Sequence, residues 1–512
     1  MQKISSAASQ TLYSVATTRQ IEQQASANLP PHTLMQRAGF SAARLVLALA
    51  PHAQRIWIAC GPGNNGGDGF EAALHLHQRG KSVVVTWIGL PDSQNKQPTD
   101  AQKSRERALA AGVLVASEAP KDFDFCVDAL LGIGAKVQLN HPDAKQIQQW
   151  LDAMATSQAP RLAIDIPTGL DADTGSFFAL NSVADYALPV YKKNIFTLSF
   201  LTLKPGLFMA SGRDRAGEIW FDDLGIHVPT TEHPCAWLLG ADRSASARRL
   251  NASHASHKGS FGDVAILGGQ SAKSSHMTGA ALLAARAALH AGAGRVLVAL
   301  LGNLDSDSMT VDPAQPELMF RSPEALDMKH QVIVCGCGGG EAVKTVLAKV
   351  LLTASRLVID ADALNAIAND AELQSLLKAR THYGYNTVLT PHPLEAARLA
   401  GITASEVQAS RLKVAVKLAE RYQCVVVLKG SGTVIVAPHQ LPFINATGNA
   451  LLATAGTGDV LAGIIGACMA SGLSVFEASC HAVFRHGEMA DIWREKRPEQ
   501  LLTASGLADF QL

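Results

Sequence analysis

Short runs of β-branched and other apolar residues alternate along the chain with longer stretches in which Ala and Leu recur at helical spacing. In the first half, these runs predict strands at 55–60, 82–89, 125–132 and 161–167. In the second half, they predict strands at 264–269, 295–300, 332–336, 356–362, 386–390 and 424–430. Strands that alternate with helices are typical of a mainly parallel sheet covered by helices, so we predict an α/β protein.

A segment rich in Ser, Ala and charged residues separates the two series of strands. We therefore predict a first domain over 1–228, a junction over 229–256 and a second domain over 257–512. The length of 512 residues suits two or three domains of roughly 100–200 residues each. The sequence contains no internal repeat that would indicate a repeat array.

Composition narrows the classes of function. Lys+Arg and Asp+Glu both total 44, and aromatic residues make up 5%. A nucleic-acid-binding protein needs a basic surplus and stacking platforms, so we expect no nucleic-acid partner. The start of the chain lacks the apolar core of a signal peptide, and glycines break the apolar stretch 460–476, so we expect no membrane span. Eight scattered cysteines are typical of a reducing compartment, which indicates a cytoplasmic protein.

A glycine-rich loop follows the first predicted strand. Its sequence, GPGNNGGDG (61–69), formally matches the pattern G-x-G-x-x-G, with a strand before it and a helix after it. A dinucleotide-binding fold also requires an acidic residue at the end of the next strand, about 20 residues further on. The first acid there is Asp92, which comes too late. We therefore disfavour an ordinary NAD-dependent dehydrogenase.

Three oxygen-bearing side chains, Asn65, Asp128 and Thr168, lie at the ends of predicted strands. Ligands of an open parallel sheet bind beyond the carboxyl ends of its strands. Convergence of the three residues would form an oxygen-only site, which suits a hard cation rather than zinc. Taken alone, Asp128 and Asp165 are more often caps of a following helix or turn. The three residues in order favour the cation site.

The first half resembles the NAD(P)H-hydrate epimerase family through GPGNNGGDG, VDALLGIG, DIPTGLDADTG and LKPGL (203–207), over most of residues 10–225. The resemblance implies a Rossmann-like three-layer domain that interconverts the R and S epimers of hydrated NADH and NADPH. It implies a potassium ion held by Asn65, Asp128 and Thr168. The substrate site that it implies is formed by Asn64, Asn65, Gly66, Gly67, Asp68, Gly132, Ile133, Gly134, Ala135, Lys136, Val137, Gln138 and Asp165.

Asp165 is the expected catalytic residue of this half. The reaction needs a group that gives and takes a proton near the nicotinamide ring, and a partly desolvated acid at a strand end can do so with a raised pKa. The segment 184–200 departs from the family pattern because it is longer and more basic. It contains none of the residues named above.

The second half contains AGTGD (455–459) at the start of an apolar helix. Backbone N–H groups at a glycine-rich helix start form an anion site, so Asp459 would stand beside a bound phosphate. The alternative is that Asp459 caps the helix and that the glycines form a tight turn. A lone histidine such as His392 is also more often structural than functional.

Together with AGTGD, the motifs VIDADALN (358–365), TPHPLEAARLAG (390–401) and VVLKGSGTVIV (426–436) resemble the ribokinase-like superfamily. Within it, the resemblance is to nucleotide-dependent NAD(P)H-hydrate dehydratases, over roughly residues 250–510. It implies substrate contacts at Ala280, Gly338, His392 and Asp459. It implies nucleotide contacts at Lys429, Gly430, Ser431, Gly432, Thr433 and Gly458. One departure is VCGCGGG (334–340), in which Cys337 replaces a proline of the family pattern.

The two resemblances together imply a fused repair enzyme for NADHX and NADPHX. In the mechanism that they imply, the C6 hydroxyl attacks the terminal phosphate of ADP or ATP, with Mg²⁺ beside the nucleotide and Asp459 as the base. Elimination of phosphate then restores the nicotinamide. Resemblance to fused bacterial-type chains favours ADP, giving AMP and phosphate, and a homo-oligomer. Two alternative functions remain: the second half could be a small-molecule kinase, and the first half could be a non-enzymatic binding scaffold.

Overall fold

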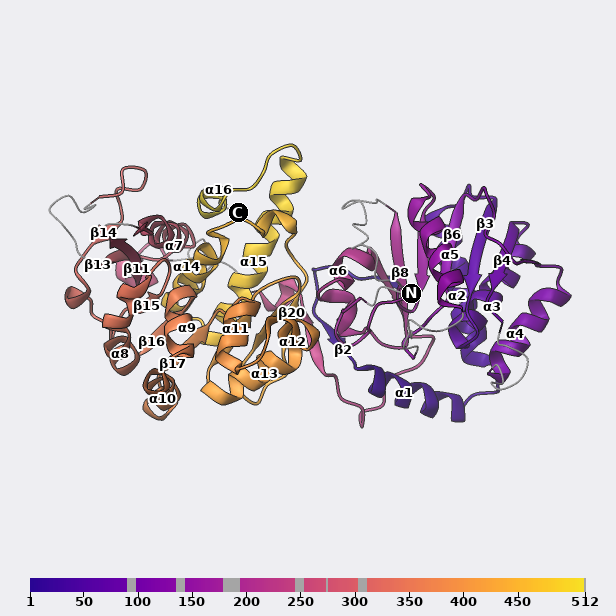
Figure 1. Cartoon of the computed structure of the whole chain (residues 1–512), viewed down its shortest axis with the longest axis horizontal. Coiled ribbons are helices and arrows are strands. Elements are labelled where there is room, and N and C mark those ends of the chain that lie inside the picture. The colour runs from indigo at the N-terminus through magenta and orange to yellow at the C-terminus, as the bar shows by residue number, and fades with distance from the viewer. Residues whose placement is uncertain are drawn as a thin grey trace. The chain divides into compact units, whose positions relative to one another are not determined.

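The computed structural model describes residues 1–89, 98–134, 143–177, 194–244, 253–272, 275–302 and 311–510. The chain forms two compact units, one made of Met1–Ser5 and Thr11–Ala236, the other of Ser6–Gln10 and Trp237–Leu512 (Figure 1). The early segment Ser6–Gln10 thus belongs to the second unit, where the backbone N–H of Ser9 donates to Asp242 Oδ1 over 2.7 Å. The functional domains expected at 1–228 and 257–512 stay a prediction.

The described part of the first unit is built on a sheet of eight strands. Their order is β1 (Gln2–Lys3), β9 (Glu218–Asp222), β8 (Ile195–Phe200), β7 (Arg161–Ile164), β6 (Phe125–Ala129), β3 (Arg55–Cys60), β4 (Ser82–Trp87) and β5 (Leu114–Ala116). Strand β1 runs antiparallel to β9, and the other neighbouring pairs are parallel. The carboxyl ends of β3, β6 and β7 therefore meet at one edge of the sheet.

Helices cover both faces of this sheet. Ile56 and Ile58 of β3 belong to a core that includes buried residues of α2 (Thr33–Leu49), α3 (Asn64–Gln78) and α4 (Thr99–Ala110). Between them, Trp57 points to the other face and shares a core with Trp150 of α5 (Ala144–Thr156). A strand that is buried on both faces has no polar side, which is why β3 reads as a nearly continuous apolar run.

The described part of the second unit has a mixed sheet of twelve strands. Their order is β14 (Met319–Phe320), β13 (Arg295–Gly302), β11 (Asp263–Ala272), β15 (Val332–Cys335), β16 (Arg356–Ile359), β17 (Asn386–Leu389), β18 (Val425–Leu428), β19 (Thr433–Val436), β20 (Phe443–Asn445), β10 (Ala236–Leu239) and β2 (Gln10–Leu12), with β12 (Ser275–His276) paired to β11. Neighbours from β14 to β18 are parallel, and β19 is antiparallel to both of its neighbours.

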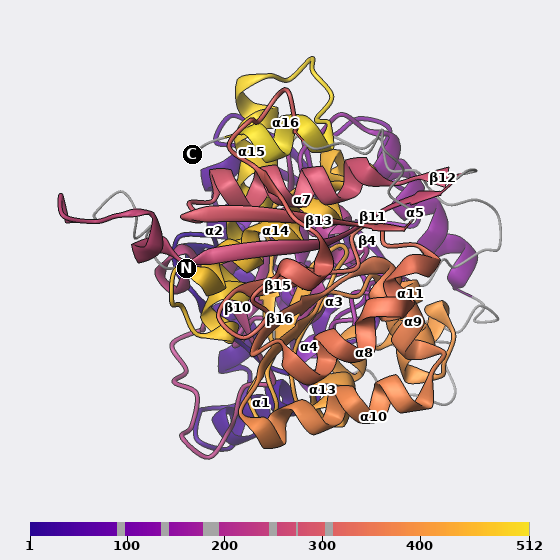
Figure 2. The same ribbon diagram turned by 90° about the vertical axis from the view of Figure 1, so that its left-hand side faces the viewer.

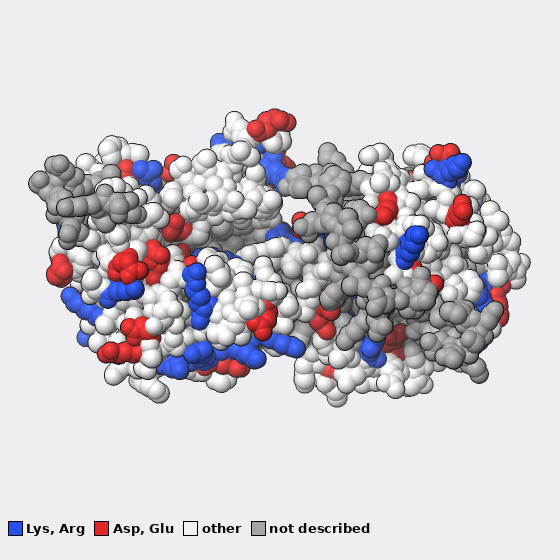
Figure 3. All heavy atoms as spheres, viewed as in Figure 1, with Lys and Arg blue, Asp and Glu red and all other residues white. Residues whose placement is uncertain are grey.

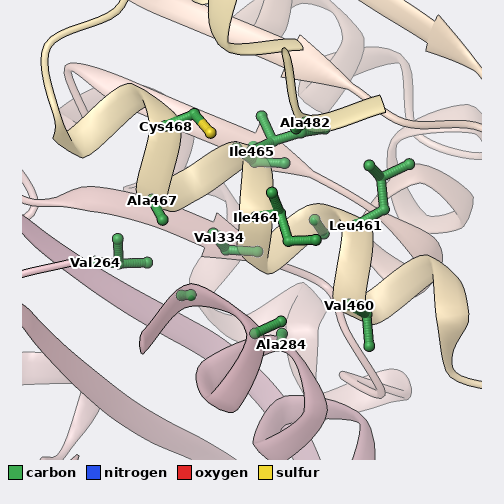
Figure 4. Close-up of a cluster of buried hydrophobic side chains, with 14 of the residues drawn as sticks. Val264, Ala284, Val334, Val460, Leu461, Ile464, Ile465, Ala467, Cys468 and Ala482 are labelled. Carbon is green, nitrogen blue, oxygen red and sulfur yellow. The ribbon is translucent and has the colours of Figure 1, made fainter. Parts of the chain in front are cut away.

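Helix α14 (Thr457–Ala470) lies at the centre of the second unit and is buried along nearly its whole length. It packs on the sheet beside α7 (Thr278–His290) and α15 (Val475–Lys496), and Figure 4 shows its side chains among Val264, Val334 and Ala284. A Cβ atom at Gly463 would lie 2.0 Å from the carbonyl oxygen of Ala284. The glycines that break this apolar stretch therefore let neighbouring elements approach closely.

A second layer of helices lies on the other side of the sheet of the second unit (Figure 2). Its members are α8 (Lys344–Thr353), α9 (Ala361–Ala368), α10 (Ala371–Ala379), α11 (Pro393–Ala400) and α13 (Arg411–Tyr422). The predicted α/β fold in two units is confirmed.

In the described ranges, none of the helices has the length and apolar character needed to cross a bilayer. Basic and acidic side chains are interspersed over the surface in view (Figure 3).

The predicted strands are all present and begin within one residue of their expected starts. Several end earlier than predicted; β7 ends at Ile164 and β16 at Ile359, each three residues before its predicted end. The residues beyond these ends, such as Asp165 and Asp360, leave the sheet and belong to the sites described below. The sequence pattern did not indicate β1, β2, β5, β8, β9, β10, β12, β14, β19 or β20; most of these strands are short or lie at sheet margins.

Candidate functional site

Strands β16, β17 and β18 deliver a buried ion pair in the second unit. Asp360, Thr390 and Lys429 are the first residues after these strands. Lys429 Nζ lies 2.6 Å from Asp360 Oδ1, and the Thr390 hydroxyl donates to the same oxygen over 2.7 Å. The side chains of Asp360 and Lys429 are 2% and 17% exposed. Burying two charges costs free energy that the pairing and the extra hydrogen bond must offset, so this arrangement indicates a function beyond stability.

Asp459 is the third residue of α14 and does not cap it. The N-cap is Gly456, with φ of 91°, and none of the described side chains makes a capping hydrogen bond there. Burial and the carboxylate of Asp360 raise the pKa of Asp459 to about 7, against the opposing effects of Cys337 and Lys429. A carboxyl group with a pKa near neutrality suits a general base. The expected proton acceptor therefore stands beside the ion pair, and the capping alternative is wrong.

The start of α14 forms the second wall of this site. A Cβ atom at Gly458 would lie 3.3 Å from Lys429 Nζ, so the glycine brings the helix backbone close to the ammonium group. The first backbone N–H groups of a helix have no partner inside the helix and carry the positive end of its dipole. Lys429, Gly458 and Asp459, predicted separately from sequence, therefore surround one place that suits an anion such as a phosphate.

The turn from Lys429 to Thr433 joins β18 to β19. The guanidinium group of Arg411 holds it in place. Gly430 and Gly432 have φ of 129° and 71°, which L side chains rarely adopt. The Arg411 guanidinium on α13 is buried, and its Nη2 donates to the carbonyl oxygens of Leu428, Lys429 and Gly432 over 3.2, 3.1 and 3.3 Å. The sequence does not single out Arg411, because it lies on a helix with an ordinary amphipathic pattern.

His392 is a helix cap that also presents its ring to solvent. Its Nδ1 accepts the backbone N–H groups of Leu394 and Glu395 at the start of α11, over 3.1 and 3.3 Å. In return, Glu395 Oε2 accepts the backbone N–H of His392 over 2.8 Å. The His392 side chain is nevertheless 46% exposed, so its structural role leaves part of the ring available to a ligand. Burial raises the pKa of Glu395 to about 7 and lowers that of His392.

Gly338 and Ala280, two predicted substrate residues, lie against each other. A Cβ atom at Gly338 would lie 2.8 Å from Ala280 Cβ, and its φ of 60° also favours glycine. The loop that follows β15 is tied to β11 by hydrogen bonds from Gly269 N–H to the Cys337 carbonyl, 2.9 Å, and from Gln270 N–H to the Gly338 carbonyl, 2.6 Å. The loop is therefore well held despite its departure from the family pattern.

The oxygen-bearing trio of the first unit fits a cation. Asp128 Oδ1 accepts the Thr168 hydroxyl over 2.7 Å, and Asp128 Oδ2 accepts the Thr168 backbone N–H over 2.9 Å. Asn65 is buried beside the Gly132 turn, and neither its amide oxygen nor its amide nitrogen has a hydrogen-bond partner among the described residues. A buried amide oxygen without a donor is costly unless something binds it. Burial raises the pKa of Asp128, and its bonds from Thr168 oppose this.

Asp165 directly follows β7 and is held by a buried lysine. Lys204 Nζ lies 2.5 Å from Asp165 Oδ1, and the lysine side chain is 0% exposed. The same ammonium donates to the Phe200 carbonyl over 2.8 Å and to Ser199 Oγ over 3.2 Å. Asp165 has φ of 63°, a strained conformation for a residue other than glycine. The ion pair fixes this carboxylate beside the end of β8, where the Phe200 backbone N–H also donates to Asp165 Oδ1 over 3.3 Å.

The glycines of the first loop serve close packing. A Cβ atom at Gly66 would lie 2.0 Å from the Gly61 carbonyl oxygen, and one at Gly67 would lie 2.5 Å from Met35 Sδ. Asn64 is exposed at the first position of α3. Burial raises the pKa of Asp68 well above its usual range, and the nearby acids Asp165, Glu22 and Glu71 raise it further.

The turn after β6 is described only in part. Gly132 adjoins Asn65, and a Cβ atom at Gly134 would lie 2.3 Å from the guanidinium of Arg19 on α1 (Val15–Ala27). Of the other predicted residues of this turn, Ile133 is half-buried, and Ala135, Lys136, Val137 and Gln138 lie outside the described residues.

Several residues of both sites were missed by sequence reasoning although they lie in quoted motifs. Asp360 falls in VIDADALN, Thr390 opens TPHPLE, and Lys204 falls in LKPGL. Asp360 and Thr390 could have been found from their position directly after a strand. Lys204 could have been found because it is a charged residue within an apolar segment. Glu22 on α1 carries no such signal. Its approach to Asp165 and Lys204, which shift its pKa together with burial, is a product of the fold.

Two family models match different parts of the chain. A family model described as NAD(P)H-hydrate dehydratase matches residues 264–509, and one described as YjeF-related protein N-terminus matches residues 31–206. The chain is 37% identical over 483 residues to the bifunctional NAD(P)H-hydrate repair enzyme of Escherichia coli (strain K12), covering 90% of this chain and 85% of that protein. It is 34% identical over 517 residues to the Coxiella burnetii repair enzyme of the same name, covering 97% of each. The ADP-dependent (S)-NAD(P)H-hydrate dehydratase of Neisseria meningitidis is 42% identical over 246 residues, covering 47% of this chain and 80% of that protein.

Proposed function

The chain belongs to the family of bifunctional NAD(P)H-hydrate repair enzymes, and from this premise we propose how its residues divide the two reactions. The protein is an isomerase and a lyase. It interconverts the epimers of hydrated NADH and NADPH, and it dehydrates the S hydrate with the help of a nucleotide. The residues that act in each reaction, the nucleotide and the ions are the proposal.

The dehydratase site is the cluster at the start of α14. Asp459 takes the proton of the C6 hydroxyl as the hydroxyl oxygen attacks the terminal phosphoryl group of the nucleotide. Lys429 and the first N–H groups of α14 stabilise the negative charge that develops on the phosphoryl oxygens. Phosphate then leaves with the C6–O bonding electrons, a proton is lost from the neighbouring ring carbon, and the ring double bond is restored. The observation that carries this proposal is Asp459, with a pKa of about 7, beside the Asp360–Lys429 pair.

The turn from Lys429 to Thr433, together with Gly458, holds the nucleotide. We propose ADP, because the Neisseria relative is named ADP-dependent and matches this half at 42% identity. The nucleotide would be bound together with Mg²⁺, which would neutralise part of its phosphate charge. His392, Gly338 and Ala280 contact the hydrated nicotinamide from the facing loops. AMP and phosphate are the other products.

The epimerase site is at the carboxyl ends of β3, β6 and β7. Epimerisation requires the C6 hydroxyl to leave from one face of the ring and water to add to the other, with a proton moved each time. Asp165 carries that proton, and Lys204 holds its carboxylate in place over 2.5 Å. The turn 64–68 and the described residues of the turn after β6, 132–134, line the substrate. Potassium, when bound by Asn65, Asp128 and Thr168, supplies a fixed positive charge beside the site, and the orphaned Asn65 oxygen supports this assignment.

A single experiment tests the function. The protein is incubated with mixed R and S hydrated NADH plus ADP, and the absorbance of NADH is followed together with the phosphorus NMR spectrum. We expect complete recovery of NADH with one AMP and one phosphate per molecule repaired. A stable phosphorylated product with no NADH would establish a small-molecule kinase instead. Repeating the assay with ATP compares the two nucleotides. Cytoplasmic location and a homo-oligomeric state stay predictions.

A further inference from the structure

We propose that Cys337 is a positioning residue of the dehydratase: its thiol donates a hydrogen bond to the carboxylate of Asp459 and holds that carboxylate toward the substrate hydroxyl. The inference deepens the proposed function and rests on the role of Asp459 as base. The residue stands out because the family pattern has a proline at this place, and proline has no side-chain donor.

The geometry brings the thiol to the reacting group. Cys337 follows β15 in the first loop of the site and is 0% exposed. Its Sγ and one carboxylate oxygen each of Asp360 and Asp459 all lie within 4.8 Å of one another. The two groups interact: Asp459 raises the pKa of the Cys337 thiol, and the thiol lowers the pKa of Asp459. The thiol therefore lies among the groups that surround the base, in contact with no solvent.

The backbone leaves this thiol little freedom to move away. The Cys337 carbonyl accepts the Gly269 N–H over 2.9 Å. A Cβ atom at Gly268 would lie 2.3 Å from the same carbonyl oxygen, so the loop is packed tightly onto β11. A side chain on so constrained a backbone can orient its partner at a low entropic cost, because few of its own conformations are lost on bonding.

The charges around Asp459 explain why a donor is useful there. The groups that face it from the neighbouring elements are the carboxylates of Asp360 and Asp362, the ammonium of Lys429 and the thiol of Cys337. The two carboxylates disfavour the ionised form of Asp459, whereas the ammonium and the thiol favour it. Glu395 in turn interacts with Lys429 and Asp360.

The thiol is suited to donate and unsuited to react. Burial and the two neighbouring carboxylates raise the pKa of Cys337 well above its usual range. It therefore stays protonated throughout the working pH range and keeps its S–H available to Asp459. The same shift removes the thiolate that nucleophilic or redox chemistry would need.

The test compares Cys337→Ala and Cys337→Ser with a matched control, Cys335→Ala, in the full-length enzyme. Cys335 is also 0% exposed and lies two residues earlier, but its pKa of about 12 is raised by burial alone, with no charged partner. Dehydration of the pure S hydrate is measured as kcat and KM from pH 5.5 to 9, alongside the melting temperature and ADP affinity. The S–H stretching band of Cys337 is identified from the infrared difference between the parent and Cys337→Ala.

We expect Cys337→Ala to lose roughly 3- to 10-fold in kcat/KM near pH 7, the weight of one ordinary hydrogen bond, because a thiol is a weak donor. The acid limb of the profile should move to higher pH by about half to one unit, and the loss should shrink at pH 9, where Asp459 is ionised in either case. Cys337→Ser, which keeps a donor, should lie closer to the parent. Cys335→Ala should leave the profile unmoved. In the parent background, Asp459→Asn should shift the S–H band of Cys337.

Two outcomes overturn the proposal. One is a Cys337→Ala profile that superposes on that of the parent, or a uniform loss at every pH that tracks a lower melting temperature, which would make Cys337 a packing residue only. The other is an S–H band that does not respond to Asp459→Asn. Neither outcome affects the proposed function, which fails separately if Asp459→Asn retains parental turnover.

Discussion

The half-buried carboxylates of the two sites have different charged neighbours. Asp165 is neutralised directly by Lys204, at 2.5 Å, and is fixed in a strained backbone conformation. Asp459 stands beside the carboxylate of Asp360, and it is Asp360 that Lys429 contacts at 2.6 Å. Burial and the neighbouring carboxylate of Asp360 leave Asp459 with a pKa of about 7, so its charge changes within the physiological range.

Asp459→Asn tests the base of the dehydratase. Asparagine keeps the size of the side chain but cannot accept the hydroxyl proton, and positioned general bases contribute about 10²- to 10⁴-fold. We expect dehydration to fall within that range, while ADP affinity and epimerisation stay near the parental values. In the parent, kcat/KM for dehydration should fall as pH drops below about 7, since Asp459 then becomes protonated. Turnover within a few-fold of the parent would remove Asp459 from the mechanism.

The same variant should be more stable than the parent at alkaline pH. The unfolded Asp459 ionises near pH 4, whereas the folded carboxyl does so near 7, so the parent loses stability as pH rises through this window. Asparagine does not titrate. We expect a gain in the free energy of unfolding that is small at pH 5 and reaches about 1–3 kcal/mol by pH 8. Denaturant melts at both pH values measure it, and an equal gain at both would contradict the raised pKa.

Asp128→Asn tests the proposed potassium site. The substitution keeps the size and an accepting oxygen but removes the charge of the trio formed with Asn65 and Thr168. Potassium should raise the melting temperature of the parent, because an ion that binds only the folded state stabilises it, and this rise should disappear in the variant. Epimerisation should fall at least about 10-fold at physiological potassium concentration, the effect of losing one strong ion–ligand interaction. Dehydration of pure S hydrate should be unchanged; loss of both activities would indicate misfolding, and a parent indifferent to potassium would contradict the site.

Packing of whole elements explains why the glycine loop of the first unit resembles a nucleotide-binding motif without its usual acid. A Cβ atom at Gly61 would meet Leu130 after β6, one at Gly66 would meet Gly61, and one at Gly67 would meet α2 and α4, so none of these glycines has room for a side chain. The glycines thus bring the start of α3 against the β6 turn, where Asn65 is buried. In the second unit, the glycines of α14 do the same against α7 and the sheet (Figure 4).

Gly66→Ala and Gly63→Ala form a matched pair that tests this packing. A Cβ atom at Gly66 would lie 2.0 Å from a backbone oxygen, whereas one at Gly63 would have no described atom within 4 Å. Overpacking typically costs about 1–3 kcal/mol, so Gly66→Ala should lower the stability of the first unit by at least that amount. Gly63→Ala should be within about 0.5 kcal/mol of the parent. Calorimetry of the full-length chain gives both values, and equal effects at the two positions would refute the packing argument.

At the scale of the whole molecule, each of the two units carries one of the two proposed sites. An epimerase is useful beside an S-specific dehydratase because it converts the otherwise inert R epimer. Cutting the chain near residue 230 is a poor way to separate them, since Ser6–Gln10 belongs to the second unit. The activities are better separated by one substitution in each site of the intact chain.

Complementation between two such variants tests the division of labour. On mixed hydrates, Asp128→Asn should dehydrate the S epimer and then stall, limited by spontaneous epimerisation. Addition of Asp459→Asn, which retains the epimerase, should release the stall. The R and S epimers are followed by chromatography, with the Asp459→Asn variant alone as the control that regenerates no NADH. Full, rapid consumption of both epimers by Asp128→Asn alone would mean that the second unit is not S-specific.

The sequence by itself determined the α/β class, the starts of the main strands and the motifs that hold most of the site residues. These features are local: burial on both faces makes a strand continuously apolar, and a turn after a strand requires glycine or a polar residue within a few positions. Tertiary structure alone decided that Lys204 meets Asp165, that Arg411 supports the 429–433 turn and that Cys337 faces Asp459. Each of these pairs joins different elements, and their contact depends on strand order and on close packing at glycines, which no local pattern encodes.

The same distinction resolves Asp459, whose place in the sequence fits either a cap or a base. Its burial beside Asp360 raises its pKa to about 7 and makes it suited to the second role.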